Sequence, residues 1–453
     1  MEKSIPGLNN MTIFALSSGS GISGVAVIRV SGKNAAKVIK ELTGLEPPVP
    51  RMATLRKVSK NGQKNLIDEA VIIWFPGPNS YTGEDLAEFH VHGSRAVIKA
   101  MHLAISKIEN CRLAEPGEFT KMAFQNGKIN LLKAESIADL ISSETEIQRK
   151  QAIKIMNGKS SDKFISWRLK LLKILSYMEA KIDFPEEDLP KNIFYEVHKT
   201  SKIIIKEIKK TLNDQKTGER IREGFKIAIV GPPNSGKSSL LNYLSKRDAA
   251  IVSETAGTTR DIIEIHLNLD GYPVVLSDTA GIRKSKNEIE KKGIKIALSH
   301  ADEADLKLVL MTAKSVEFTD VLTKLLSKNA ILVVNKMDLA KGKLSKKFNK
   351  YDKVPISIKQ DFNLDKLIKK IKNKLKNKFI STEDILITRE RHRKNLLSCV
   401  EHLEKFHKRK AVRDIDKAAE DLRLATRHLG MIVGKVDVEE LLGSIFNDFC
   451  IGK

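Results

Sequence analysis

The sequence lacks long apolar runs and contains little cysteine. No apolar run approaches the ~18 residues of a membrane-spanning helix, and mean hydropathy is −0.24, which excludes an integral membrane protein. Met1–Ser20 has no basic start, apolar stretch and small-residue cleavage site, so no secretion signal is predicted. The cysteines Cys111, Cys399 and Cys450 lie far apart, which excludes a disulfide framework or a CxxC metal knuckle. Three cysteines are typical of a reducing cytoplasm, where we expect this protein.

Acidic residues are scarce relative to basic ones. The chain has 79 Lys and Arg against 56 Asp and Glu, a net charge of +23 and a pI of about 9.6. Such an excess is typical of a nucleic-acid partner. However, only 19 of the basic residues are arginine, and a lysine excess also arises from an AT-rich genome. We interpret the Lys-rich run 341–380 as a solvated helix face, so charge alone leaves RNA binding open.

The length of 453 residues suggests roughly three domains at about 150 residues each. Residues 1–125 have an α+β pattern. Short β-branched or aromatic runs at Thr12–Leu16, Val25–Val30 and Ala70–Phe75 predict strands, and Ala96–Ile108 has helical spacing. Gly19–Gly24 has the GxGxxG spacing of a dinucleotide fingerprint, but a strand rather than a helix is predicted after it, which argues against a Rossmann site.

The remaining chain alternates between two patterns. Residues 126–216 have helical spacing, interrupted at 184–190 (FPEEDLP). Residues 217–380 alternate strands with helices, which predicts a mostly parallel sheet with helices on both faces. Residues 381–453 are again helical. We therefore predict a multidomain α/β and α fold in which an α/β domain interrupts one helical domain; a linear arrangement of four domains is the alternative.

The strongest motif is Gly231–Ser238 (GPPNSGKS), which fits GxxxxGK[ST]. It follows a predicted strand and precedes a predicted helix, which is the context of a phosphate-binding loop. Its glycines let backbone N–H groups face the phosphates, and the helix N-terminus favours negative charge. Lys237 neutralises the β and γ oxygens, and Ser238 supplies a hydroxyl to Mg²⁺.

Two further motifs follow predicted strands. In Asp278–Gly281 (DTAG), the Asp278 carboxylate can hold Mg²⁺ through water, and Gly281 can offer its N–H to the γ-phosphate. In Asn335–Asp338 (NKMD), the Asp338 carboxylate can accept hydrogen bonds from two N–H groups of guanine, and adenine has no such pair. Ser357–Lys359 stands where a loop closes over the base. Together the motifs predict a GTPase.

The segment Ser253–Asp261 (SETAGTTRD) lies between these motifs and predicts the first switch, with Thr259 as second Mg²⁺ ligand; a plain turn is the alternative. Ile282 follows DTAG where small GTPases often have a water-orienting Gln. The carboxamide of Asn234 could instead help to bind a monovalent cation, or only shape the loop. Glu288 and Glu290 are both candidates to position water.

The chain ends in FCIGK. Cys450 is fourth from the end, but Gly452 and Lys453 fit a CaaX prenylation signal poorly. Cys450 could instead be a free reactive thiol or a buried apolar residue.

The residues closely resemble the MnmE (TrmE) type of tRNA modification GTPase over essentially the whole chain. Beyond the GTPase motifs, the resemblance rests on six segments: Ser31–Gly32, Trp74–Asp85 (WFPGPNSYTGED), Pro116–Phe119 (PGEF), Ala134–Leu140 (AESIADL), Asp183–Glu187 (DFPEE) and Phe449–Lys453 (FCIGK). Met1–Asn10 resembles an extension, Ile358 replaces a usually small residue, and Ser253 stands where the family often has Thr.

The resemblance implies a folate-binding and dimerising N-terminal domain, a discontinuous helical domain and an inserted Ras-like P-loop GTPase domain. It implies a homodimer that joins an FAD-dependent partner, MnmG, in a heterotetramer. Together they add a carboxymethylaminomethyl group to carbon 5 of the wobble uridine of certain tRNAs. The one-carbon unit comes from 5,10-methylene-tetrahydrofolate, for which the 5-formyl form is an analogue, and the amine from glycine or ammonium.

The resemblance also implies roles for individual residues. Folate contacts fall on Arg29, Glu88, Lys128 and Lys453. Potassium ligands fall on Asn234, Ser253, Thr255 and Thr258, and magnesium ligands on Ser238 and Thr259. The water-orienting carboxylate falls on Glu290 rather than Glu288, and Cys450 and Lys237 complete the catalytic candidates. Nucleotide contacts fall on Asn234, Ser235, Gly236, Lys237, Ser238, Ser239, Ser253, Thr258, Thr259, Asp278, Thr279, Ala280, Gly281, Asn335, Lys336, Asp338, Ser357, Ile358 and Lys359.

Two functional hypotheses remain open at this point. The first is a GTPase subunit of a tRNA-modifying enzyme. The second is a regulatory or assembly GTPase that binds RNA or the ribosome without modifying it. The candidate folate residues and the FCIGK ending favour the first.

Overall fold

The computed structural model describes residues 11–19, 21–60, 65–184, 193–247, 264–278, 303–313, 323, 325–326, 329–340, 351–376, 385–409, 414–436, 442, 445–446, 449 and 452. Their contacts form two compact units. Unit 1 comprises Met1–Ala138, Met156–Arg168 and Arg427–Lys453, and unit 2 comprises Asp139–Ile155 and Leu169–Thr426. The four domain boundaries drawn from the sequence stay predictions.

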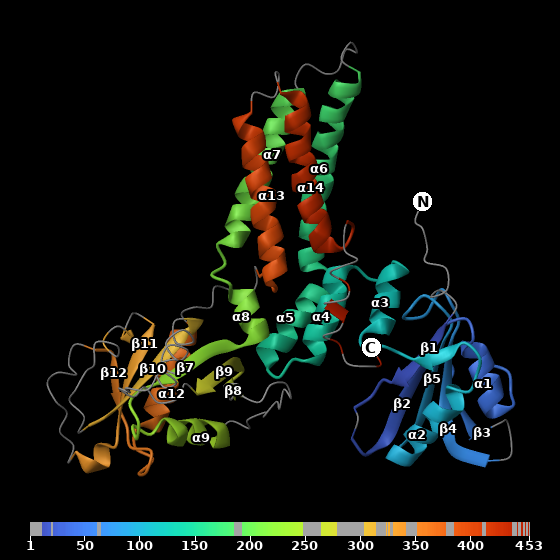
Figure 1. The fold of residues 1–453 in the computed structure, drawn as a ribbon, viewed down its shortest axis with the longest axis horizontal. Helices are drawn as coiled ribbons and strands as arrows, with labels where there is room; N and C mark the ends of the chain where they lie inside the picture. Colours follow the sequence, from blue (N-terminus) through green and yellow to red (C-terminus); the bar gives the residue numbers. More distant parts are fainter. Residues whose placement is uncertain are drawn as a thin grey trace, which may run out of the picture. The chain divides into compact units, whose positions relative to one another are not determined.

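Unit 1 contains a six-stranded sheet of order β3-β4-β5-β2-β1-β6 (Figure 1). Its strands are β1 (Thr12–Leu16), β2 (Ser23–Ser31), β3 (Thr54–Lys60), β4 (Asn65–Phe75), β5 (Leu86–Gly93) and β6 (Cys111–Leu113). All neighbouring strands are antiparallel except β1 and β6. The predicted strands are confirmed, and the strand after Gly19–Gly24 confirms the argument against a dinucleotide fingerprint.

The two faces of this sheet carry different cores, because side chains alternate along each strand. On one face, Phe14 and Ile28 pack against helices α1 (Ala35–Thr43) and α2 (Arg95–Ile105). On the other, Ile13 and Ala15 pack with Phe119 of α3 (Glu118–Gln125). The side chain of Ser94 caps α2 by accepting from the Val97 N–H at 3.1 Å.

Unit 1 also contains α4 (Leu131–Ile141) up to residue 138, residues 159–168 of α6 (Lys159–Asp183) and residues 427–433 of α14 (Ile415–Val433). Phe446 and Phe449 pack against Leu131 and Ala134. Gly434 has a φ of 78°, and a Cβ there would lie 2.8 Å from the Phe124 ring. At the last described residue, Ser17 donates its hydroxyl to the Gly452 carbonyl at 2.7 Å.

Unit 2 contains a second six-stranded sheet, of order β12-β11-β10-β7-β9-β8. Its strands are β7 (Phe225–Val230), β8 (Glu264–Leu269), β9 (Tyr272–Asp278), β10 (Leu306–Thr312), β11 (Ala330–Asn335) and β12 (Lys353–Pro355). Only β8 runs antiparallel to its neighbour, so the predicted mostly parallel sheet is confirmed. Helices α9 (Lys237–Arg247) and α12 (Leu364–Lys376) pack on one face.

Helix α12 tests the interpretation of the Lys-rich run. Leu364, Leu367, Ile368, Ile371 and Leu375 are buried, whereas its lysines are exposed or half-buried. This amphipathic arrangement confirms a solvated helix face for residues 364–376.

The other described α-helices of unit 2 are α5 (Glu146–Met156), α6 (Lys159–Asp183), α7 (Ile193–Leu212), α8 (Thr217–Glu223), α13 (Glu390–Lys408) and α14 (Ile415–Val433). Three of them belong to unit 2 only in part: α5 up to residue 155, α6 from residue 169 and α14 up to residue 426. Helices α7 and α13 pack side by side although far apart in sequence (Figure 1). Within the described ranges, no helix is long and apolar enough to cross a membrane.

Short helix α8 links these helices to the second sheet. Arg220 forms an ion pair with Asp305, immediately before β10, at 2.6 Å. Glu219 accepts from Arg393 of α13 at 2.7 Å, and both side chains are buried. Asp214 binds the same guanidinium at 2.6 Å. Because a buried charge is costly unless it is paired, these contacts fix α8 between the two parts of unit 2.

Candidate functional site

The phosphate-binding loop lies between β7 and α9, as predicted. Gly231 and Gly236 are both required by close packing. A Cβ at Gly231 would lie 2.3 Å from the Leu310 carbonyl oxygen, and one at Gly236 would lie 2.2 Å from the Asn335 amide nitrogen. Gly236 also has a φ of 101°, a conformation that side chains disfavour.

Lys237 is buried at the start of α9. Its ammonium donates to the Gly231 and Pro232 carbonyls, each at 3.1 Å. These bonds hold the amine over the loop, where it can meet phosphate oxygens. Ser238 and Ser239 are exposed in the first turn of α9, so their hydroxyls are accessible. Asn234 is exposed at the loop tip in a left-handed conformation with a φ of 58°.

The candidate base-binding residues meet the phosphate-binding loop directly. Asn335 is buried at the end of β11, and its side-chain amide donates to the Ser235 carbonyl at 2.9 Å. Its Oδ1 accepts from the Lys336 N–H at 2.7 Å and the Ile358 N–H at 3.4 Å. One side chain thus connects three of the predicted motifs.

Asp338 is held by the last of these motifs. The Ser357 hydroxyl donates to Asp338 Oδ1 at 2.7 Å, and Ser357 is itself buried. Ser357 also closes its own loop through paired backbone bonds with Phe362. Lys359 lies within this short loop. The geometry therefore fixes the Asp338 carboxylate beside a closed loop.

Asp278 ends β9, and its main chain lies beside Ile229 in the parallel ladder. Because the carboxyl ends of parallel strands meet at one sheet edge, this brings the Asp278 backbone to the edge that carries the phosphate-binding loop. The other predicted residues lie outside the described parts of the chain: Ser253, Thr255, Thr258, Thr259, Thr279, Ala280, Gly281, Ile282, Glu288, Glu290, Cys450 and Lys453.

In unit 1, Arg29 and Glu88 form an ion pair on the sheet face that packs against α3. They are direct partners in the β2–β5 ladder. Arg29 Nε and Nη2 donate to Glu88 Oε1 at 3.1 and 2.8 Å. His90 Nε2 lies 3.5 Å from Glu88 Oε2.

Aromatic rings surround this guanidinium. Its Cζ lies 5.5 Å from the ring centre of Tyr81 and 5.7 Å from that of Phe119. The Tyr81 hydroxyl pairs with that of Thr120 at 2.8 Å, and burial raises the pKa of Tyr81. Sequence reasoning did not assign Tyr81 and Phe119 a role, although both stand in the WFPGPNSYTGED and PGEF segments.

Lys128 is exposed in the turn that follows α3. Its Cε would lie 3.1 Å from a Cβ at Gly83. It therefore reaches the loop that carries Tyr81. The fourth predicted folate contact, Lys453, follows Gly452, whose carbonyl is anchored to Ser17 after β1. The structure brings Arg29 and Glu88 together, and places Lys128 against the Tyr81 loop.

Comparison with known families identifies the chain. The family model described as GTP-binding protein TrmE N-terminus matches residues 12–128, and that of the MnmE helical domain matches residues 131–450. The chain belongs to the MnmE family of tRNA modification GTPases. The MnmE resemblance seen in the sequence is therefore confirmed.

Full-length MnmE relatives agree. The tRNA modification GTPase MnmE of Pelagibacter ubique (strain HTCC1062) is 69% identical over 443 residues, covering 98% of this chain and 100% of that protein. MnmE of Rickettsia bellii (strain RML369-C) is 46% identical over 446 residues, with the same coverage. Among solved structures, the G domain of the T. maritima FeoB iron transporter matches with 26% identity and a TM-score of 0.28, covering 33% of this chain and 98% of that one.

Proposed function

We propose that this chain is a GTP hydrolase acting in tRNA modification. Membership of the MnmE family supports the activity. The proposed preference for GTP over ATP is supported by two hydrogen bonds: Asn335 donates to Ser235, and Ser357 donates to Asp338. Steady-state hydrolysis assays test it: GTP is hydrolysed and ATP is not, and equal turnover of both would contradict the proposal.

For the hydrolysis step, Lys237 neutralises charge on the β and γ phosphates from its position over the loop. The exposed Ser238 hydroxyl, with Thr259, would hold Mg²⁺, which stabilises developing charge when bound. Asn234, with Ser253, Thr255 and Thr258, would hold K⁺ beside the phosphates. The exposed position of Asn234 at the loop tip fits this role. Glu290 would orient the attacking water, because Ile282 cannot.

The N-terminal cluster would bind the tetrahydrofolate that supplies the one-carbon unit. Arg29 is a cation that could hold a folate carboxylate or polar ring edge, and Glu88 could accept from pterin N–H groups. Tyr81 and Phe119 supply flat apolar surface beside them. Lys128 and Lys453 would complete the polar contacts. The residues present therefore fit the chemistry of folate.

The working assembly would be a homodimer joined to the FAD-dependent MnmG partner, in the cytoplasm, with the α/β domain inserted between two helical segments. It would install the carboxymethylaminomethyl group at the wobble uridine, with Cys450 as a candidate participant. Mass analysis of wobble nucleosides from a deletion strain tests this proposal. The modified uridine should disappear and return with the intact gene; unchanged nucleosides would refute it.

A further inference from the structure

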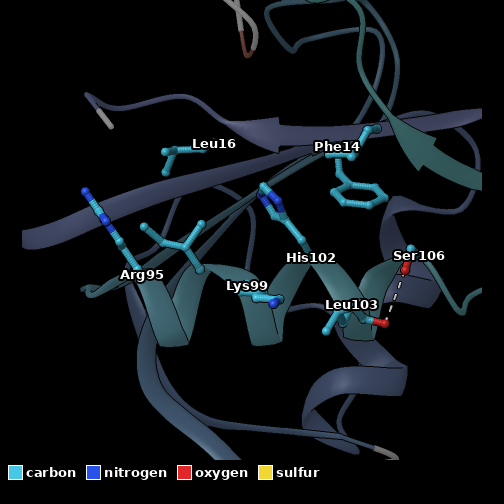
Figure 2. A pocket seen from close by; sticks show the side chains of 9 residues that line it. Phe14, Leu16, Arg95, Lys99, His102, Leu103 and Ser106 are labelled. Carbon is cyan, nitrogen blue, oxygen red and sulfur yellow. Dashed lines mark hydrogen bonds between the residues drawn. The ribbon is translucent and has the colours of Figure 1, made fainter. Parts of the chain in front are cut away.

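A cavity of about 370 Å³ lies in unit 1 between α2 and the β1–β6 edge of the sheet (Figure 2). Its size falls within the range of small-molecule sites. Phe14 and Leu16 line it from β1, and these side chains face α2. Arg29 lies in the neighbouring strand on the opposite face, which packs against α3. The cavity is therefore separate from the candidate folate cluster.

Most of the lining is apolar. Phe14, Leu16 and Ile98 are joined by Leu103 and Leu113, each of which is 53% exposed. Large exposed leucines on both sides of one cavity leave apolar surface in water that a ligand could cover. The lining therefore favours a ligand with an apolar body.

Both charged residues in the lining, Arg95 and Lys99, are positive. Arg95 and Lys99 lie four residues apart on α2, and neither side chain makes a hydrogen bond or ion pair with any part of the chain that the structure describes. Among the residues that the structure describes, no acidic one lines the cavity. Like charges at this spacing repel, and cations are unfavourable near a helix N-terminus. An anion bound between them would remove both unfavourable effects.

His102 also lines the cavity. Its Nε2 is buried and has no hydrogen-bond partner among the described residues, and burial lowers the pKa of the ring. Figure 2 shows the ring rising from α2 toward Phe14, and the ring centres lie 5.6 Å apart. Because Nε2 is buried from the cavity as well as from solvent, the His102 ring forms part of the wall but does not offer this nitrogen to a ligand.

We propose that this cavity binds a small organic carboxylate with an aromatic or branched apolar body. The apolar part lies against Phe14, Leu16 and Leu113. The carboxylate lies beside Arg95 and Lys99, where a guanidinium can bind it through two hydrogen bonds. The His102 ring lies in the wall beside the ligand, so its environment changes on binding.

Calorimetric titration of the full-length protein with 3-phenylpropionate tests this proposal. Its uncharged amide is the matched probe. The acid should bind saturably at one site. The affinity for the amide should be lower by a factor of about ten or more, because charge-assisted hydrogen bonds are the stronger ones. The imidazole ¹⁵N signals of His102, assigned through His102→Gln, should shift with the acid. Failure to saturate, or equal affinity for acid and amide, would overturn the proposal.

Paired variants locate the site. Arg95→Ala/Lys99→Ala should weaken acid binding about tenfold or more, since it removes both cations. Lys206→Ala/Lys210→Ala on α7 makes the same change in net charge at exposed positions and should leave affinity unchanged. Arg29→Ala should also retain it, which separates this cavity from the candidate folate cluster. Unchanged affinity in the α2 variant, or loss in the Arg29 variant, would refute the assignment.

Discussion

Asn335 and Ser235 are 100 residues apart, yet the Asn335 side-chain amide donates to the Ser235 carbonyl at 2.9 Å. This bond joins the end of β11 to the phosphate-binding loop. It also explains why residue 236 has no side chain, because a Cβ there would lie 2.2 Å from the same amide. The base-binding and phosphate-binding parts of the site therefore depend on each other.

The first prediction separates two effects of a side chain at residue 236: its steric clash with Asn335 and the strain of the backbone conformation. Gly236→Ala should strongly reduce GTP affinity, because the new methyl group displaces Asn335. Gly271→Ala is the matched control: it has a similar φ of 90°, but no atom of the described residues lies within 4 Å of a Cβ there. It should cost only the conformational strain, about 1–2 kcal/mol of unfolding free energy. Equal GTP affinity in the two variants, measured by fluorescent-nucleotide titration, would contradict the prediction.

The second prediction concerns guanine recognition. Asp338→Asn should weaken GTP binding by about 10²-fold, which corresponds to losing roughly 3 kcal/mol of charged hydrogen bonding. Xanthosine triphosphate should bind better than before, because an amide can meet the altered base edge. Asp361→Asn removes the same charge at an exposed position near Ser357 and should change neither affinity. Unaltered GTP selectivity in Asp338→Asn would show the assignment of 335–338 to be wrong.

Local patterns in the sequence were sufficient for parts of this fold and site. The strand–loop–helix around Gly231–Ser238 was predictable because spacing, glycine positions and flanking periodicity are local properties. Contacts that depend on three-dimensional packing were not. Phe119 meets Arg29 because α3 covers one face of the sheet, and Tyr81 reaches the same guanidinium from the loop between β4 and β5. The Glu219–Arg393 ion pair joins residues 174 apart, and no spacing rule predicts it.

The third prediction tests the N-terminal cluster. Charge reversal at Arg29 should abolish binding of 5-formyl-tetrahydrofolate and leave GTP hydrolysis largely intact. Because Arg29→Glu would place a second carboxylate beside Glu88, the swap Arg29→Glu/Glu88→Arg is the better variant. It preserves an ion pair between the same ladder positions but inverts the charge at each. Calorimetry showing wild-type folate affinity in the folded swap variant would count against the site.

The fourth prediction concerns pH and the contact between α7 and α13. His198 Nδ1 lies 3.1 Å from His407 Nδ1, and Ser201 Oγ lies 3.0 Å from His407 Nε2. Burial, with lesser contributions from His198 and Lys202, lowers the pKa of His407 to about 4, and burial also lowers that of His198. The unfolded chain, with an ordinary histidine pKa near 6.5, therefore binds protons first as pH falls.

This linkage has a definite sign. The contribution of these histidines to stability should be fully present above about pH 6.5 and should be lost progressively toward pH 4. His407→Gln removes one titrating group, so its melting temperature should fall less between pH 7 and pH 5 than that of the wild type. Parallel pH profiles in thermal denaturation would contradict the assignment.

The last prediction concerns how GTP is hydrolysed without a glutamine at Ile282. K⁺ should accelerate hydrolysis well above Na⁺, because the larger ion suits a wider ring of oxygen ligands. Removing one placed electrostatic group from such a site costs about 10²–10³ in rate. Asn234→Ala should therefore lose K⁺ stimulation yet bind nucleotide, because Lys237 and the loop backbone remain, with Lys237 held by Gly231 and Pro232.

Two glutamate variants complete this test. Glu290→Ala should lose turnover but keep K⁺-driven dimerisation of the GTPase domains, since orienting water and closing the switch are separate tasks. Glu288→Ala should be mild and serves as the matched control two residues away. Turnover measured in K⁺ and Na⁺, with dimerisation followed by light scattering, distinguishes these outcomes. Equal wild-type rates in both ions, or K⁺ stimulation that survives Asn234→Ala, would refute the mechanism while leaving GTP hydrolysis itself intact.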